Sequence, residues 1–133
     1  MIEIIGVDTN IISYIFRQDT RAGLYEPHLV GKLKVIAAQT FAELELLPLQ
    51  NFWSEKRQRK LRKLLDDYVI IETDKKISLY WAKIQFEARK KGTPVSVGDA
   101  WIAATALAYS LPLVTHNYKD FKNISDLQII SEV

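Results

Sequence analysis

The sequence of 133 residues contains no cysteine, which excludes disulfide bonds, thiolate metal sites and cysteine nucleophiles. No apolar run approaches the roughly 18 residues of a membrane-spanning helix. The N-terminus lacks the basic segment and apolar stretch of a signal peptide. We therefore expect a cytoplasmic protein with no membrane association. With 48% apolar residues, the chain has enough material for one domain over residues 1–133, and too little for two.

Positive charge is unevenly distributed, although the net charge is only +2 and does not by itself identify a nucleic-acid partner. It gathers in two stretches, EKRQRKLRK at residues 55–63 and RKK at residues 89–91. Most such runs are the solvated face of a helix. The alternative is contact with the phosphate backbone of a nucleic acid. The candidates for that contact are Arg57, Lys60, Arg89 and Lys90.

Short apolar segments alternate along the chain with longer segments of helical pattern. Strands are predicted at residues 2–7, 33–37, 68–72, 113–115 and 127–130. Helices are predicted at residues 9–16, from 40 to an interruption at Pro48, and at 52–67, 75–91 and 99–110. Gly92 is the expected stop of the helix over 75–91, and residues 26–31 fit either a loop or a short helix. This alternation predicts an α/β fold, a parallel sheet covered by helices on both faces.

Three acidic residues, Asp8, Glu43 and Asp99, lie just after predicted strands or at the start of an apolar helix. Each alone has an explanation as a helix cap, because Asp is a favoured N-cap and both TFAE (40–43) and SVGD (96–99) match the capping-box pattern. Together, however, all three can reach one edge of the sheet. Carboxylates that share a cleft raise one another's pKa, and a divalent cation removes that conflict. Oxygen ligands of this kind favour Mg²⁺ or Mn²⁺ over zinc.

A fourth candidate segment follows the predicted strand at residues 113–115. Thr115 offers a hydroxyl and Asn117 a carbonyl to water or metal, although Asn117 is also typical of a turn or N-cap. The two histidines, His28 and His116, lack the spacing of a metal-binding pair, so a loop role is expected for His28.

Asn117 and Asp120 compete for the fourth position of the site. Asp120 carries the charge, but Asn117 lies nearer the end of the strand, where ligands bind in such sheets. Asn117 also fits the cap of a short helical turn in which the carboxylate of Asp120 turns back to the backbone. We therefore predict that Asn117 faces the metal or its water shell and that Asp120 is mainly structural.

Four ordered motifs resemble those of the PIN-domain nucleases, and within them the VapC-like toxins of prokaryotic toxin–antitoxin pairs. The motifs are VDTNII (7–12), TFAEL (40–44), VGDAWIAATAL (97–107) and LVTHNYKDF (113–121). They span nearly the whole chain. The resemblance implies a three-layer α/β/α PIN-like fold with a five-stranded parallel sheet. It also implies Mg²⁺- or Mn²⁺-dependent hydrolysis of RNA phosphodiester bonds, a small VapB-like antitoxin as partner, and a homodimer.

The resemblance also carries site residues over, position by position. The acidic positions of the family fall on Asp8, Glu43 and Asp99, and a fourth position that is acidic in many members falls on Asn117. Asp8 and Asp99 would hold the metal, and Glu43 would bind a second metal or act as a base. Supporting roles are predicted for Thr9, Asn10, Thr115 and Asp120.

Other functional classes fit the sequence less well. A non-catalytic PIN-fold module that binds RNA or protein is favoured slightly by the uncharged Asn117, while the intact carboxylates argue against it. A phosphoacceptor domain would place its aspartate after the third strand, where Glu72 and Asp74 match poorly. A phosphohydrolase with an Asp-x-Asp motif is excluded because Thr9 and Asn10 follow Asp8.

Overall fold

The strands of the protein form one parallel sheet. The computed structural model describes residues 1–133 and places its five strands in the order β3-β2-β1-β4-β5. The strands are β1 (Ile4–Val7), β2 (Leu33–Ala37), β3 (Val69–Ile71), β4 (Leu113–Val114) and β5 (Ile129–Ile130). Every neighbouring pair is parallel. The predicted five-stranded parallel sheet is confirmed, and the strand ends lie at or within two residues of the predicted ranges.

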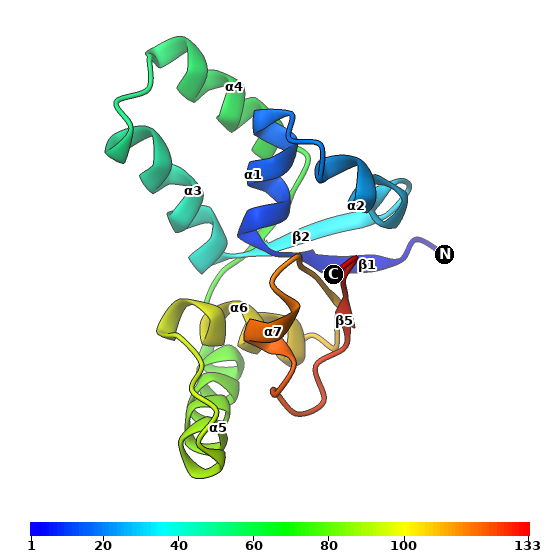
Figure 1. Ribbon diagram of the computed structural model, residues 1–133, viewed down its shortest axis with the longest axis vertical. Helices are drawn as coiled ribbons and strands as arrows, with labels where there is room; N and C mark the ends of the chain where they lie inside the picture. The colour runs from blue at the N-terminus through cyan, green and yellow to red at the C-terminus, as the bar shows by residue number, and fades with distance from the viewer.

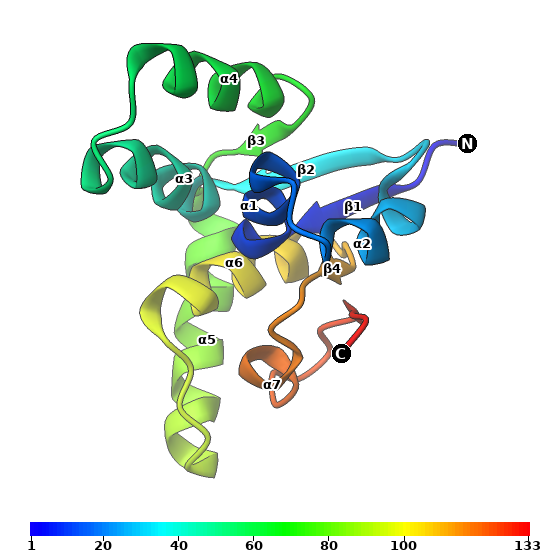
Figure 2. The ribbon, with the colours of Figure 1, turned by 45° about the horizontal axis from the view of Figure 1, so that its top comes forward.

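Helices cover both faces of this sheet, which makes three layers (Figures 1 and 2). The first group is α1 (Thr9–Arg17), α2 (Ala22–Leu29), α3 (Ala38–Gln50) and α4 (Glu55–Leu65), and the second is α5 (Lys75–Lys91), α6 (Val97–Ala108) and α7 (Tyr118–Phe121). The first group packs around an apolar cluster that contains Ile5 and Leu61, and the second around a cluster that contains Ile77 and Phe121. Burial of both faces explains why the central strands are nearly uninterrupted apolar runs.

Two prolines lie inside helices, which the sequence patterns did not predict. Pro48 does not interrupt α3, because it is buried near the end of a helix that continues to Gln50. Pro27 lies in α2, so the undecided segment at residues 26–31 is mostly the end of a helix. A proline removes one backbone donor from a helix, and in both helices packing against the core compensates for that loss.

None of the helices combines the length and apolar character needed to cross a lipid bilayer.

Serine caps decide where two of the helices begin. α4 begins at Glu55 rather than at the predicted residue 52, because the hydroxyl of Ser54 accepts a hydrogen bond from the first turn and Phe52 has a φ of 52°. α6 begins two residues earlier than predicted, because Ser96 caps it in the same way. In each case the local hydrogen bond, rather than the apolar pattern, defines the first residue of the helix.

The strand order brings three chain segments to one edge of the sheet. β1 lies between β2 and β4, so the order reverses beside it. The backbone N–H of Asp8 donates to the carbonyl of Val114 at 2.9 Å, which places the residues after β1 and β4 side by side. α3 leaves the end of β2 on the other side of β1. Ligands of such sheets bind at this kind of edge.

Candidate active site

Asp8 is both the cap of α1 and a buried carboxylate at the end of β1. Its Oδ1 accepts from the backbone N–H of Thr9 at 2.8 Å, and its Oδ2 accepts from the hydroxyl of Thr115 at 2.7 Å. The residue is only 3% exposed. Burial raises the pKa of Asp8 from 3.8 to about 6 against both hydrogen bonds, and the charges of Asp99 and Glu43 add to the rise. A cap alone gains nothing from burying a charge, so this carboxylate also points to a ligand site.

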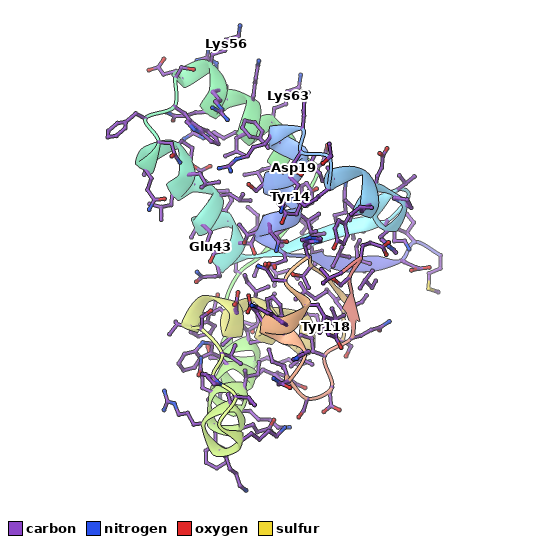
Figure 3. All side chains as sticks on the ribbon, viewed as in Figure 1. Tyr14, Asp19, Glu43, Lys56, Lys63 and Tyr118 are labelled. Atoms are coloured by element: carbon purple, nitrogen blue, oxygen red, sulfur yellow. The ribbon has the colours of Figure 1, made fainter.

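Glu43 is held toward the same place from α3. The helix begins two residues before Thr40, so Thr40 is not its N-cap and the capping-box interpretation of TFAE is wrong. Instead, Glu43 Oε1 accepts from the hydroxyl of Thr9 at 2.5 Å, and Oε2 accepts from Gln39 Nε2 at 3.1 Å. Figure 3 shows Glu43 at the sheet end of α3. Thr9 therefore links the start of α1 to the carboxylate of Glu43.

Asp99 reaches the site from the second group of helices, in the first turn of α6. Ser96 accepts the Asp99 N–H at 3.1 Å and so performs the capping. Gly98 permits close approach to α3, because a Cβ there would lie 3.1 Å from Glu43 Oε2. Burial is the main cause that raises the pKa of Asp99; the charges of Asp120 and Glu43 add to the rise, and the Ser96 hydroxyl opposes it. Asp99 and Glu43 thus share one electrostatic environment.

The residues after β4 divide into a buried support and two exposed side chains. Thr115 is fully buried, donates to Asp8 and accepts from the backbone N–H of Asn117 at 3.0 Å. Asn117 precedes α7, but its exposed side chain does not form the predicted cap. Asp120 is also exposed, and its carboxylate forms no hydrogen bond with the backbone of α7. The mainly structural role predicted for Asp120 depended on such a hydrogen bond, so the structure does not support it. The charge of Asp120 acts on Asp99 instead.

An open cleft of about 430 Å³ joins these side chains. We call it the acidic cleft; it is lined by Asp8, Thr9, Asn10, Ser13, Glu43, Leu46, Leu47, Gln50, Asp99 and Asn117. The predicted carboxylates and Asn117 therefore face one space. No three acidic or histidine side chains already lie at the spacing of a formed metal site. A cation that binds in the acidic cleft would have to draw the carboxylates together.

Tyr25 is a residue near the site that the sequence analysis missed. It is fully buried, its Oη lies 2.6 Å from His116 Nδ1, and it accepts the backbone N–H of Glu132 at 3.0 Å. The phenol oxygen thus accepts from Glu132, and its own proton can go to His116 Nδ1 or to the carbonyl of Thr115 at 3.5 Å. His116 in turn donates its backbone N–H to Asn10 Oδ1 at 3.5 Å. Tyr25 thus connects the C-terminal segment to the loop that carries Thr115 and Asn117. Its segment had no clear pattern, so nothing in the sequence marked it.

Replacing Tyr25 by phenylalanine should lower the free energy of unfolding by about 1–3 kcal/mol, because the N–H of Glu132 and Nδ1 of His116 would lose their partner in a buried place. Urea denaturation at neutral pH measures the change. Tyr80→Phe is a matched control, since its hydroxyl makes no hydrogen bond and its loss should stay within about 0.5 kcal/mol. Equal losses in the two variants would show that the Tyr25 hydroxyl is not a structural link.

The two basic stretches lie at opposite ends of the molecule. Arg57 and Lys60 are on α4 and line a hollow beside the end of α1. Arg89 and Lys90 are in the last turn of α5, which points away from α4 (Figures 1 and 2). The first stretch adjoins α1, which lines the acidic cleft, and Arg89 of the second stretch lines a separate hollow with the start of α6, the helix that carries Asp99.

Comparison with known proteins agrees with the fold and the site. The sequence matches the profile of the PIN domain over residues 5–127. This chain belongs to the PIN-domain family. It is 32% identical over 126 residues to ribonuclease VapC1 of Haemophilus influenzae strain R2866, and the match covers 92% of each chain. It is 31% identical over 123 residues to ribonuclease VapC2 of Rickettsia felis, covering 91% of this chain and 92% of that protein.

Solved structures of PIN-domain relatives have the same fold. The VapBC2 complex of Rickettsia felis, bound to a DNA fragment from its promoter, contains a chain with a TM-score of 0.86 and 28% identity, covering 96% of this PIN-domain protein and 98% of that chain. VapBC-1 of nontypeable Haemophilus influenzae gives a TM-score of 0.83 and 30% identity, with coverage of 96% and 97%. The resemblance to VapC-like proteins inferred from the four motifs is confirmed.

Proposed function

We propose that this PIN-domain protein is a metal-dependent endoribonuclease that acts as the toxin of a VapBC-type toxin–antitoxin pair. The acidic cleft is the observation that carries the proposal: Asp8, Glu43 and Asp99 come from three separate elements and face one open space. The relatives that match over nine-tenths of the chain are named ribonucleases. Raised pKa values at Asp8 and Asp99 are typical of a functional site.

The donor atoms of the acidic cleft fit Mg²⁺ or Mn²⁺. Its ionisable ligands are carboxylates, without thiolate or imidazole, as these cations prefer. Asp8 supports the fit further, because its ionised form is costly in a buried place and would gain most from a cation. When bound, the ion supplies a water of lowered pKa and neutralises charge on the phosphate oxygens.

Each site residue then has a role. Asp8 and Asp99 would hold the ion, and Glu43 would either hold a second ion or orient the attacking water as a base. Thr115 fixes the direction of the Asp8 carboxylate through its hydrogen bond, and Thr9 does the same for Glu43. Asn117 offers its carbonyl to the metal or to its water shell.

The proposed partner is a small VapB-like antitoxin. The solved relatives are VapBC complexes. An arginine from the antitoxin would fit the acidic cleft, since guanidinium groups bind carboxylates through paired, charge-assisted hydrogen bonds. We further propose a homodimer, on the resemblance to this family, and action in the cytoplasm, where RNA and antitoxin would meet.

RNA cleavage by the purified chain tests the proposed function. We expect cuts in a structured RNA with Mg²⁺ or Mn²⁺, a complete stop with EDTA, and recovery when the metal is restored. An Asp8→Asn preparation purified in parallel controls for contaminating nucleases. Cleavage that survives EDTA, or that is equal in both preparations, would mean that the acidic cleft is not a nuclease site. No cleavage under any condition would favour the non-catalytic module.

A further inference from the structure

A second hollow lies one helical turn along α1 from the acidic cleft. It has a volume of about 450 Å³, and we call it the basic hollow; its cationic side chains are Arg17, Lys56, Arg57 and Lys60. The two places share one helix, because Ser13 lines the acidic cleft and Arg17 lines the basic hollow. Residues four apart lie on the same face of a helix and about 6 Å apart along its axis. The basic hollow and the acidic cleft thus lie about one helical turn apart along α1.

The cations of the basic hollow form no ion pairs with the rest of the protein. No carboxylate lines the hollow, and none of its four cations takes part in an ion pair. The ion pairs of α4 involve its other arginines, Arg59 with Glu55 and Arg62 with Glu45. Like charges gathered in this way repel one another, and an anion in the hollow would remove the repulsion.

Arg57 is held in place by aromatic rings. Its guanidinium lies 4.0 Å from the centre of the Trp53 ring and 5.7 Å from that of Phe16, and the two rings stack on each other at 5.3 Å. A guanidinium that is fixed on an aromatic face keeps its planar set of donors ready for a phosphate. Figure 3 shows Lys56 on α4, at the opposite end of the α3–α4 pair from Glu43.

We propose that the basic hollow binds the phosphate backbone of the RNA strand whose scissile phosphate lies in the acidic cleft. This inference rests on the proposed function. A cluster of carboxylates cannot hold a polyanion except through the cation between them, so the neighbouring phosphates need positive partners elsewhere. The basic hollow supplies these partners one turn along α1 from the cleft, and it gathers four cations, whereas Arg89 is the one cation of a separate hollow at the start of α6. Such contacts position the strand without reading its sequence.

Salt-dependent RNA binding tests the inference. Lys60→Gln and Arg17→Gln remove exposed charges that have no protein partner, and both are made in an Asp8→Asn background so that the RNA stays intact. The probe is a fluorescein-labelled single-stranded RNA, and its anisotropy is measured at several salt concentrations. Each substitution should weaken binding about fivefold at 0.1 M salt and lower the slope of log affinity against log salt by about 0.7, the value for one released phosphate contact. The matched control is Lys83→Gln on α5, which should leave affinity and slope unchanged.

Three outcomes overturn the inference. Unchanged binding in Lys60→Gln and Arg17→Gln, with a background that binds RNA and a parent that cuts it, removes the hollow from the RNA path and leaves the proposed function intact. An equal loss in Lys83→Gln would mean that only the overall charge matters. A chain that neither binds nor cuts RNA overturns the proposed function as well.

Discussion

Asp8→Asn should reduce the rate of RNA cleavage by at least about 100-fold, the upper range for loss of a group that merely supports a metal ligand. Asparagine keeps the size of the side chain and can still accept the Thr9 N–H, but it removes the charge that would hold a cation. Initial rates at saturating Mg²⁺ measure the effect. Asp126→Asn is a matched control, because Asp126 is exposed, lies outside the acidic cleft and has a φ of 67° that asparagine tolerates. If Asp8→Asn cuts RNA as fast as the parent, Asp8 is not part of the site.

Asp8→Asn should also change how the free energy of unfolding depends on pH in the metal-free protein. The folded-state pKa of Asp8, about 6, lies above the ordinary value of 3.8, so ionisation costs the folded state. The stability that protonated Asp8 provides is complete below about pH 3.8 and is lost as the pH rises through about 6. The full loss is on the order of 3 kcal/mol.

Urea denaturation in EDTA between about pH 4 and pH 8 separates this contribution from other titrations. The parent should lose stability relative to Asp8→Asn as the pH rises, and the difference between the two curves belongs to Asp8. Parallel curves would mean that the Asp8 carboxyl does not titrate at a raised pKa.

Asn117→Asp should tighten Mn²⁺ binding on the order of tenfold, the lower range for groups that support a metal site. Asn117 lines the acidic cleft but brings no charge, so a carboxylate there adds attraction for a cation. Calorimetric titration of Mn²⁺ into the metal-free protein measures the affinity.

Asp120→Asn is the comparison for this variant. Asp120 lies outside the lining of the acidic cleft, and its charge reaches the site only through Asp99. Its loss should weaken Mn²⁺ binding by less than Asn117→Asp strengthens it. Because its carboxylate makes no backbone hydrogen bond, stability should stay within about 0.5 kcal/mol. Unchanged affinity in Asn117→Asp together with a large loss in Asp120→Asn would assign the fourth position to Asp120.

Local patterns predicted most of the fold. β2 and α5 have the predicted ends, and Gly92 stops α5 with a φ of 70°. These features depend on a few neighbouring residues: an apolar run between polar ends, a helical period, a glycine that adopts a left-handed conformation at no steric cost. The prediction was wrong at Pro48, where burial of the helix outweighs the proline. There the packing of distant segments decides, and no local pattern carries it.

The sequence by itself determined which residues are candidates for chemistry, since the ordered motifs that resemble the PIN family name Asp8, Glu43, Asp99 and Asn117. Only the tertiary structure decided that all four face one cleft. It also decided that Thr9, rather than a capping box, orients Glu43, and it brought the Tyr25 hydroxyl within 2.6 Å of His116 Nδ1. These contacts join residues that are 34 and 91 positions apart. Contacts at such separations depend on the order of strands in the sheet and on how helices pack against it, which the local physics of the chain does not specify.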